Sequence, residues 1–544
     1  MVMEDSLFWA DQLAKQVLDR AKKEKQDGIS SGIPVIRTAQ TPSGGKHIGN
    51  LNDVLRAHFV YKSLKDKGHK VRFVHTHDDR DPMKDVPGRL ADLDAKWHNT
   101  QEFPELKKYL GVPLIMVPDP FGCCKSYGEH FSALWIKGLE MIGVEAENIS
   151  TNALYEAGKF EPYVIKTFEN IQEASRILAK HQSTKEEGYI PFDAICPKCN
   201  RLANVSSFDI AQKTVSFTCG GKAIKKKMSE GCGFVGEIPW SQGKLQWRFE
   251  WPAQWGIFKT TFEPFGKDHY EGSWKSGQEI MRAIFKEEPP IPYVYEFFLV
   301  NGEKMSASVG NVYITQDMLK LLEPETFLFF YTKRPGMQRD LDLKNIFRLV
   351  DDFESAENVY FGKESKIKID EKNMKRSYEM CFAAAPKSQP IRIDYKFAAL
   401  IGQSGGDVDR AIDLLKFTGH IKDKVTEKDK QVIAKRIESA TYWAQNFADP
   451  QFRITLNEKL PDVSLNAHQK AAISELKEEI KKEKSEEELQ LAVFNISRAN
   501  SMEPKDFFRL IYQILINKDS GPRLGPFVIA VGKKKVMNLL DGVE

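Results

Sequence analysis

The sequence predicts an α/β domain with a parallel sheet, which carries a cysteine-bearing insert and is followed by an α-helical C-terminal half. Residues 34–76 run as strand, glycine-rich turn, helix and strand, and such a βαβ succession implies a parallel sheet. Four of the seven cysteines gather between Cys196 and Cys232. From about residue 341 onward the chain is highly charged and helical in its pattern.

Length and composition limit the class of protein. With 544 residues the chain has room for three or four domains of about 150 residues each. The absence of an apolar run of about 18 residues excludes a membrane span, and residues 1–20 read as an amphipathic helix without the features of a signal peptide. Seven cysteines are too few for a disulfide scaffold, so we expect a reducing compartment, the cytoplasm. A net charge of +3 neither requires nor excludes a nucleic-acid partner, although Lys225–Lys227 and Lys533–Lys535 are local basic clusters.

Turn residues and hydrophobic periodicity define the first elements. Residues 34–39 read as a buried strand, His47–Lys67 as a helix that Gly68 closes, and residues 71–76 as a second strand. We divide the chain into an N-terminal helix (1–30), a first half of the α/β domain (31–150), an insert (151–244), a second half (245–340) and a helical domain (341–544).

A glycine-rich turn follows the first predicted strand. Residues 41–50 read Thr-Pro-Ser-Gly-Gly-Lys-His-Ile-Gly-Asn. Small residues let the backbone approach a ligand, and the N-terminus of the following helix offers N–H groups to an anion. His47 and Asn50, three residues apart, can both donate to a phosphate oxygen, while Gly49 leaves a flat floor for a purine ring. A turn with a capping histidine is the structural alternative.

A second loop lies far downstream, after an apolar strand signal at residues 291–300. Residues 302–311 read Gly-Glu-Lys-Met-Ser-Ala-Ser-Val-Gly-Asn. Lys304 supplies positive charge, and the hydroxyls of Ser306 and Ser308 supply hydrogen bonds, which suits a loop over a polyphosphate. By itself the segment is equally compatible with a solvated turn.

Together the two segments resemble the paired signatures of class I aminoacyl-tRNA synthetases, His-Ile-Gly-His and Lys-Met-Ser-Lys-Ser. The form with His-Ile-Gly-Asn is similar to that of the class I lysyl-tRNA synthetases. Further stretches resemble the same family, at residues 118–131, 247–255, 265–269, 294–296 and 521–527. Two departures stand out: Asn50 replaces the second histidine, and Ala307 replaces the second lysine. The cationic role then falls to Lys304 and to a neighbour such as Lys46.

The resemblance implies a fold and a set of site residues. The fold is a Rossmann-like class I synthetase catalytic domain with a zinc-binding insert for the tRNA acceptor stem, plus an α-helical C-terminal anticodon-binding domain. The implied catalytic residues are His47, Asn50, Lys304, Ser306 and Ser308. The implied ATP-binding residues are Thr41, Ser43, Gly44, Gly49, Asp268 and Lys304. The implied amino-acid-binding residues are Asp78, Trp247, His269 and Tyr295. Mg²⁺ accompanies ATP, and the partners are L-lysine and tRNA(Lys).

The implied amino-acid pocket lies where the second strand ends, at the edge of a parallel sheet where ligands gather. There Asp78 would hold the α-ammonium group, and aromatic faces would pack the lysine stem and attract its cation. A helix cap or ion pair is the alternative for Asp78, and a core position is the alternative for Trp247. Arg37 stands where glutamyl and glutaminyl relatives carry an arginine that meets the substrate. Either Arg37 points elsewhere, paired with Asp79 or Asp81, or the substrate is acidic.

The cysteine cluster begins with the knuckle Cys196-Pro-Lys-Cys199, and Cys219 and Cys232 follow at wider spacing. Four thiolates suit a closed tetrahedral Zn²⁺ site, which has no open position for catalysis. Four unliganded thiols, or a redox pair, are the alternatives. We interpret Cys123, Cys124 and Cys381 as core or surface thiols, and a second metal site built from His75, His77 and Cys123 is the alternative for Cys123.

We therefore expect an aminoacyl-tRNA ligase that activates L-lysine with ATP and transfers it to tRNA(Lys), monomeric and without a membrane partner. A glutamyl-type class I synthetase is an alternative, favoured by Arg37. A synthetase-derived RNA-binding protein is another, favoured by Asn50 and Ala307. The small nucleotidylyltransferases share the His-x-Gly-x turn, but those chains are usually much shorter.

Overall fold

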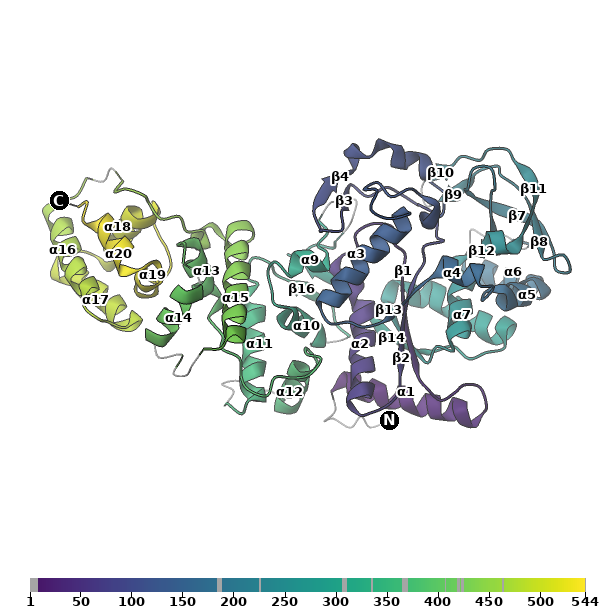
Figure 1. Ribbon diagram of the computed structural model, residues 1–544, viewed down its shortest axis with the longest axis horizontal. Coiled ribbons are helices and arrows are strands. Elements are labelled where there is room, and N and C mark those ends of the chain that lie inside the picture. Colours follow the sequence, from purple (N-terminus) through teal and green to yellow (C-terminus); the bar gives the residue numbers. More distant parts are fainter. Residues whose placement is uncertain are drawn as a thin grey trace. The chain divides into compact units, whose positions relative to one another are not determined.

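The computed structural model describes residues 8–182, 188–224, 227–305, 311–333, 336–363, 370–406, 408–417, 421, 425–461 and 464–543 (Figure 1). The chain forms two compact units. Unit 1 takes in residues 1–317, 328–341 and 369–383, and unit 2 takes in residues 318–327, 342–368 and 384–544.

A five-stranded parallel sheet is the centre of unit 1. Its strands are β1 (Val35–Gln40), β2 (Arg72–His77), β5 (Glu147–Ser150), β13 (Phe262–Gly266) and β14 (Ile291–Tyr295), in the order β14-β13-β1-β2-β5. The strand order reverses between β1 and β13, and in such sheets ligands bind beyond the carboxyl ends at this point. The predicted βαβ unit and parallel sheet are confirmed.

The helix expected from His47 begins later. His47 is extended, with ψ 160°, a single 3₁₀ turn (Ile48–Asn50) follows, and α2 runs over Leu51–Asp66. The backbone N–H of Ile48 donates to the carbonyl of Tyr313 at 2.9 Å, outside the helix, and so the chain enters α2 through a tight turn. This difference keeps the signature residues on a loop at the end of β1.

The two faces of the sheet are covered differently. Helix α1 (Trp9–Gln26) packs on α2, which packs on β1, β2 and β13. A second, aromatic core contains Val35 and Val74 from the sheet and continues into α7 (Trp247–Phe258) and the insert. The other helices of unit 1 are α3 (Tyr127–Met141), α4 (Thr151–Glu156), α5 (Glu161–Glu169), α6 (Ile171–His181), α8 (Lys275–Ile280) and α12 (Glu371–Glu379).

The cysteine-bearing insert folds as an antiparallel sheet of order β11-β8-β7-β6-β12. Its strands are β6 (Phe192–Ile195), β7 (Leu202–Asp209), β8 (Thr214–Thr218), β11 (Val235–Pro239) and β12 (Gly243–Leu245). Three two-stranded pairs complete unit 1: β3 (Arg89–Ala91) with β4 (Trp97–Asn99), β9 (Lys222–Ile224) with β10 (Lys227–Ser229), and β15 (Phe298–Val300) with β16 (Arg339–Leu341). The strand signal at residues 291–300 is therefore two strands, β14 and β15.

Among the described residues of unit 2, all regular secondary structure is helical. Its helices are α11 (Phe347–Tyr360), α13 (Tyr395–Gln403), α14 (Val408–Phe417), α15 (Glu427–Asn446), α16 (Ala467–Lys481), α17 (Glu486–Ala499), α18 (Pro504–Ile516), α19 (Leu524–Val531) and α20 (Lys533–Leu540), while α9 (Thr315–Met318) and α10 (Pro324–Thr332) precede them. Buried Trp443 donates from Nε1 to the carbonyl of Leu343 at 3.0 Å, which ties α15 to the segment before α11. Among the described residues, no helix is long and apolar enough to cross a membrane.

Candidate active site

The glycine-rich turn after β1 encloses a cavity of about 180 Å³. Its lining residues are Ser43, Gly44, Gly45, Lys46, His47, Asn50, Pro87, Arg89, Trp97 and Val312. Gly44 has φ +143°, and a Cβ there would lie 2.9 Å from Cγ of Pro87. Glycine is required at this position because any other residue would be strained and would collide with Pro87.

The two signature segments, distant in sequence, meet at this turn. A Cβ on Gly49 would lie 2.7 Å from Nδ1 of His47 and 3.2 Å from Cε of Met305, the residue after Lys304. Gly49 thus lets the His47 ring and the downstream loop lie against the same backbone. Ser306 and Ser308 lie outside the described residues.

His47 is held as a neutral imidazole. Burial, together with the positive charges of Lys46 and Lys304, lowers its pKa to about 4. Its Nδ1 is buried and has no hydrogen-bond partner within the described part of the chain. A neutral imidazole can donate one N–H to a phosphate oxygen without protonation of the ring.

Lys304 is exposed, and its Nζ lies 4.5 Å from the ring centroid of Phe297. Asn311 donates from Nδ2 to the carbonyl of Lys304 at 3.2 Å, which joins the two ends of the loop. The charge of Lys304 acts on His47, and its exposed ammonium group is accessible to an anionic ligand.

The strand ends of β13 and β14 carry the predicted Asp268, His269 and Tyr295. A Cβ on Gly266 would lie 2.6 Å from Oδ1 of Asp268 and 3.7 Å from the ring of Tyr295, so both side chains flank this glycine. The Asp268 side chain is 81% exposed. The His269 ring lies 6.2 Å from that of Trp247, which stacks on Trp251 at 5.3 Å. Trp247 is half-buried against the aromatic core, so its ring can contribute both to this core and to the predicted amino-acid pocket.

Asp53 is a site residue that the sequence interpretation missed. Tyr295 donates its hydroxyl to Oδ1 of Asp53 at 2.6 Å. Burial raises the pKa of Asp53 to about 8, and the charges of Glu263 and Asp268 add to this shift. Its position three residues after Asn50 could have indicated a side chain on the same face of α2.

Asp78 lies at the end of β2, as predicted, and is buried. Its Oδ1 accepts hydrogen bonds from Oγ1 of Thr151 at 3.0 Å and from Nε2 of Gln254 at 3.1 Å. Burial raises the pKa of the Asp78 carboxyl. The neighbouring Asp79, rather than Asp78, accepts the N–H of Asn152 at 2.8 Å in the first turn of α4. The N-cap of α4 is Ser150, whose hydroxyl accepts the N–H of Ala153, and Asp79 adds a second acceptor, so Asp78 does not cap this helix.

Arg37 is completely buried, and its partner is Glu263 on β13. Its Nη1 donates to both carboxylate oxygens of Glu263, at 2.8 and 2.9 Å, and its Nη2 donates to Oγ1 of Thr76 at 2.7 Å. Trp251 and Trp255 also donate to Glu263, at 2.7 and 2.8 Å. The pairing of Arg37 with Asp79 or Asp81 is thus wrong, because Glu263 on the adjacent strand neutralises the guanidinium.

A second buried ion network links the insert to the sheet. Lys244 on β12 donates to Asp81 and forms an ion pair at 2.8 Å with Glu250 on α7. Asp81 also accepts from Lys84 at 2.8 Å and from the hydroxyl of the predicted ATP-binding residue Thr41 at 3.4 Å. Lys244 and Lys84 hold the pKa of Asp81 well below its usual range.

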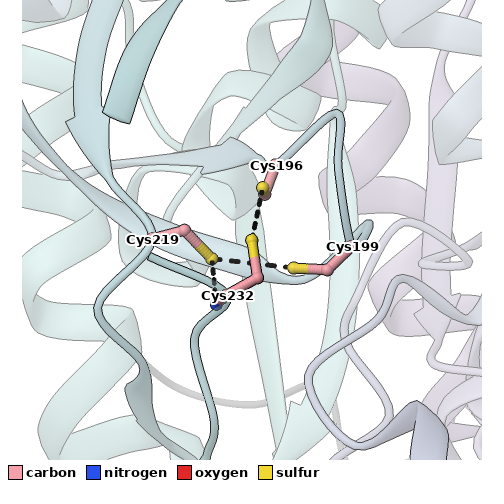
Figure 2. Close-up of side chains that lie close together, drawn as sticks. All are labelled: Cys196, Cys199, Cys219 and Cys232. Carbon is pink, nitrogen blue, oxygen red and sulfur yellow. Dashed lines mark hydrogen bonds between the residues drawn. The ribbon is translucent and has the colours of Figure 1, made fainter. Parts of the chain in front are cut away.

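The four clustered cysteines can hold a metal ion (Figure 2). Sγ of Cys196 lies 3.6 Å from that of Cys232, and Sγ of Cys199 lies 3.6 Å from that of Cys219. Four sulfurs each ~2.3 Å from one Zn²⁺ would be about 3.8 Å apart, so the spacing fits a tetrahedral zinc site. It is too long for disulfides, whose S–S bond is about 2.05 Å.

A second cluster brings together Asp119, Cys123, Cys124 and His130. Nδ1 of His130 lies 3.2 Å from Sγ of Cys123 and 3.2 Å from Oδ1 of Asp119. Nε2 of His130 contacts the carbonyl of Ala91 at 3.0 Å, which assigns the ring proton to Nε2 and leaves the Nδ1 lone pair for a ligand.

The hypothesis of a second metal site built from His75, His77 and Cys123 is wrong, because other residues engage both histidines. Nε2 of His75 accepts from Trp135 at 2.9 Å, and its Nδ1 contacts Thr38. His77 bonds Asn148 at 3.0 Å. Both rings are therefore engaged by other side chains, and Cys123 contacts His130 instead.

The parallel sheet, with the glycine-rich turn at its switch point and the adjoining lysine loop, agrees with the fold expected of a class I aminoacyl-tRNA synthetase. Residues 7–383 match the family described as tRNA synthetases class I (K). Because this match covers more than half of the chain, the protein belongs to that family.

Relatives match along almost the whole length. The chain is 38% identical to a lysine–tRNA ligase of Natronomonas pharaonis, covering 98% of this chain and 97% of that one. It is 36% identical to the lysine–tRNA ligase of Haloarcula marismortui, over 97% and 96% of the two chains. Identity to the lysine–tRNA ligase of Thermococcus kodakarensis is 32%, over 98% and 99%.

Proposed function

We propose that the protein is a lysine–tRNA ligase. The observation that carries this proposal is the ion pair between Arg37 and Glu263. An acidic substrate would need a cation in the pocket that no protein carboxylate neutralises, and Glu263 neutralises Arg37. With Arg37 neutralised, the pocket keeps the buried carboxyl of Asp78 for the α-ammonium group, and aromatic rings suit the cation of the lysine side chain. The names of the full-length relatives support the same substrate.

In the proposed reaction, a carboxylate oxygen of lysine attacks the α-phosphorus of ATP. The bond to the β-phosphate oxygen breaks, and pyrophosphate leaves with its electron pair. A terminal ribose hydroxyl of the tRNA then attacks the lysyl carbonyl and passes its proton to a phosphate oxygen of the adenylate. The bond between the carbonyl carbon and the phosphate oxygen breaks, and AMP leaves with its electron pair. Mg²⁺ bound with ATP would neutralise phosphate charge. His47, Asn50, Lys304, Ser306 and Ser308 would align the phosphates and stabilise the charge that develops on them.

The remaining roles belong to the same proposal. Asp78 would bind the α-ammonium group, and Trp247, His269 and Tyr295 would enclose the lysine side chain, with an aromatic face toward its cation. Thr41, Ser43, Gly44, Gly49 and Asp268 would bind ATP. The insert would contact the acceptor stem and the helical residues 341–544 the anticodon of tRNA(Lys), in a cytoplasmic monomer.

ATP–pyrophosphate exchange tests the substrate. The purified full-length protein is assayed with lysine, glutamate or glutamine, each with and without tRNA. We expect exchange that depends on lysine. Exchange with glutamate alone would replace the proposal with a glutamyl-type enzyme, and no exchange in any condition would support an RNA-binding protein that has lost activation.

We further propose that the cysteine cluster holds Zn²⁺ and that the Asp119 cluster holds a second such ion. Metal analysis should give two zinc ions per chain. Cys199→Ser should lose one ion and lower the melting temperature, because a structural zinc contributes folding free energy directly. Cys123→Ser should lose the other ion, whereas Cys381→Ser, at a buried cysteine outside both clusters, should keep both. An unchanged zinc content in Cys199→Ser would contradict the first site.

A further inference from the structure

Tyr295 is the last residue of β14, and among the described residues its hydroxyl has one hydrogen-bond partner. The hydroxyl donates to Oδ1 of Asp53 at 2.6 Å. A Cβ on Gly266, the last residue of β13, would lie 3.7 Å from the hydroxyl oxygen and 2.6 Å from Oδ1 of Asp268. The hydroxyl oxygen therefore lies at the carboxyl ends of the strands, where ligands of such sheets bind.

The direction of this hydrogen bond determines what the tyrosine oxygen can still bind. A tyrosine hydroxyl donates one proton and accepts through its lone pairs. Burial raises the pKa of Tyr295 well above its usual range, and the charges of Asp53 and Asp268 add to this shift, so the hydroxyl keeps its proton. Because that proton is used in the bond to Asp53, only lone pairs are left for a ligand. An ammonium group can donate to them, whereas a carboxylate has no proton to donate.

Asp53 has a fixed position because it belongs to the first turn of α2, which packs on β13 and β1. Buried Arg56, three residues further along the helix, donates to the carbonyl of Tyr331. The hydroxyl of Tyr331 donates in turn to the carbonyl of Ile48 at 2.8 Å, just before the helix. These bonds hold the start of α2, and so the acceptor for the Tyr295 proton is part of a rigid element.

The bond to Tyr295 does not require a charge on Asp53. Burial raises the pKa of Asp53 to about 8, and the carbonyl oxygen of a neutral carboxyl group can accept a hydrogen bond as a carboxylate oxygen does. An amide oxygen in the same place would also accept it. Asp53 is therefore suited to take the tyrosine proton rather than to hold a cation itself.

We propose that Asp53 determines substrate specificity as a positioning residue that acts through Tyr295. By accepting the phenolic proton, it presents the tyrosine oxygen to the pocket as an acceptor for the ε-ammonium group of lysine. The side-chain carboxylate of glutamate would place lone pairs against the lone pairs of this oxygen. The inference rests on the proposed function, which makes lysine the substrate, and adds the protein group that meets the end of its side chain.

Lysine and norleucine form a matched pair of ligands for the test, because norleucine has the same carbon chain without the ε-ammonium group. ATP–pyrophosphate exchange by the full-length protein, with tRNA present, gives the KM for lysine and the inhibition constant of norleucine. Asp53→Ala should raise the KM for lysine about tenfold and leave the inhibition constant of norleucine within about twofold, since a hydrogen bond to a charged group is lost. Equal weakening of both ligands would indicate a general disturbance of the pocket and overturn the proposal.

Three more variants isolate the hydrogen bond. Asp53→Asn keeps an acceptor oxygen and should hold the KM for lysine within about threefold of that of the unchanged protein. Tyr295→Phe loses the oxygen and should repeat the effect of Asp53→Ala, and the double variant should lose no more than either single one, because both changes remove the same interaction. The matched control is Asp19→Ala, at an exposed carboxylate on α1, which should change neither constant. An unchanged KM for lysine in Tyr295→Phe would overturn the proposal even if Asp53→Ala does not fold.

The same assay separates this inference from the proposed function. If the unchanged protein shows no exchange that depends on lysine, the proposed function fails and the inference fails with it. If lysine-dependent exchange is present but Asp53→Asn loses as much as Asp53→Ala, the charge of Asp53 is what matters, and only the inference fails.

Discussion

Glu263→Gln should lower the free energy of unfolding by about 3–5 kcal/mol, because it leaves Arg37 as a buried, uncompensated charge. The Glu263 carboxylate accepts from Arg37 and from the indole N–H groups of Trp251 and Trp255. A neutral amide cannot balance the guanidinium charge. Denaturant-induced unfolding of unit 1, followed by the fluorescence of the buried tryptophans, measures the loss.

The same substitution should impair lysine binding. Arg37 donates to Thr76, Thr76 bonds Gln254 at 3.3 Å, and Gln254 donates to Asp78, so the freed charge is two hydrogen-bonded residues away from the proposed ammonium site. We expect the KM for lysine to rise at least about tenfold, since a nearby like charge repels the substrate.

A double variant provides the control for Glu263. Arg37→Met combined with Glu263→Gln removes the buried cation but keeps an acceptor for the tryptophans, and should recover most of the lost stability. A Glu263→Gln protein as stable as the unchanged one, with an unaltered KM for lysine, would show that the pair does not govern this pocket.

His47→Ala should slow lysine-dependent ATP–pyrophosphate exchange by about 10²–10³-fold, the usual loss when one preorganised donor to a developing oxyanion is removed. The Nδ1 of His47 is buried and has no protein partner among the described residues, so its bonding capacity is left for a ligand. His47→Gln retains an N–H donor and should recover part of the rate. A melting temperature close to that of the unchanged protein would assign the loss to catalysis rather than folding.

The pH dependence checks the charge state of this histidine. A folded-state pKa of about 4 means that His47 in the free enzyme is neutral from pH 5 to pH 8 and gains a proton only below that range. The kcat/KM profile should therefore show no His47 limb between pH 5 and 8, and His47→Gln should keep the same shape. A limb near pH 6 that disappears in His47→Gln would contradict the neutral, buried imidazole.

Local patterns were sufficient for much of the fold. Residues 34–39 and 71–76 alternate and cluster in the way that buried strands do, and they became β1 and β2 with shifts of one residue. The start of α2 was misplaced because His47 looks like a helical residue in sequence. Only the bond from Ile48 to Tyr313, more than two hundred residues away, shows that the chain is still in a turn there.

Only part of the candidate site could be predicted from the sequence. The two signature segments and the strand-end residues could be found because each lies in a short, continuous motif. Glu263 could not, because it acquires its role from Arg37 on another strand, β1. Asp53 had a signal in its spacing from Asn50, but its partner Tyr295 lies on β14 and is not visible from that spacing. Among the cysteines, Cys123 was linked to the wrong histidines for the same reason.

By itself the sequence determined the parallel-sheet domain, the cysteine quartet and the residue types at the phosphate turn, since these depend on spacing over a few residues. The tertiary structure alone decided which charges neutralise one another. Arg37 meets Glu263 because β1 and β13 are adjacent in the sheet although 226 positions separate the two residues. A Coulomb interaction depends on distance and burial, and neither can be read from positions along a chain until the sheet is assembled.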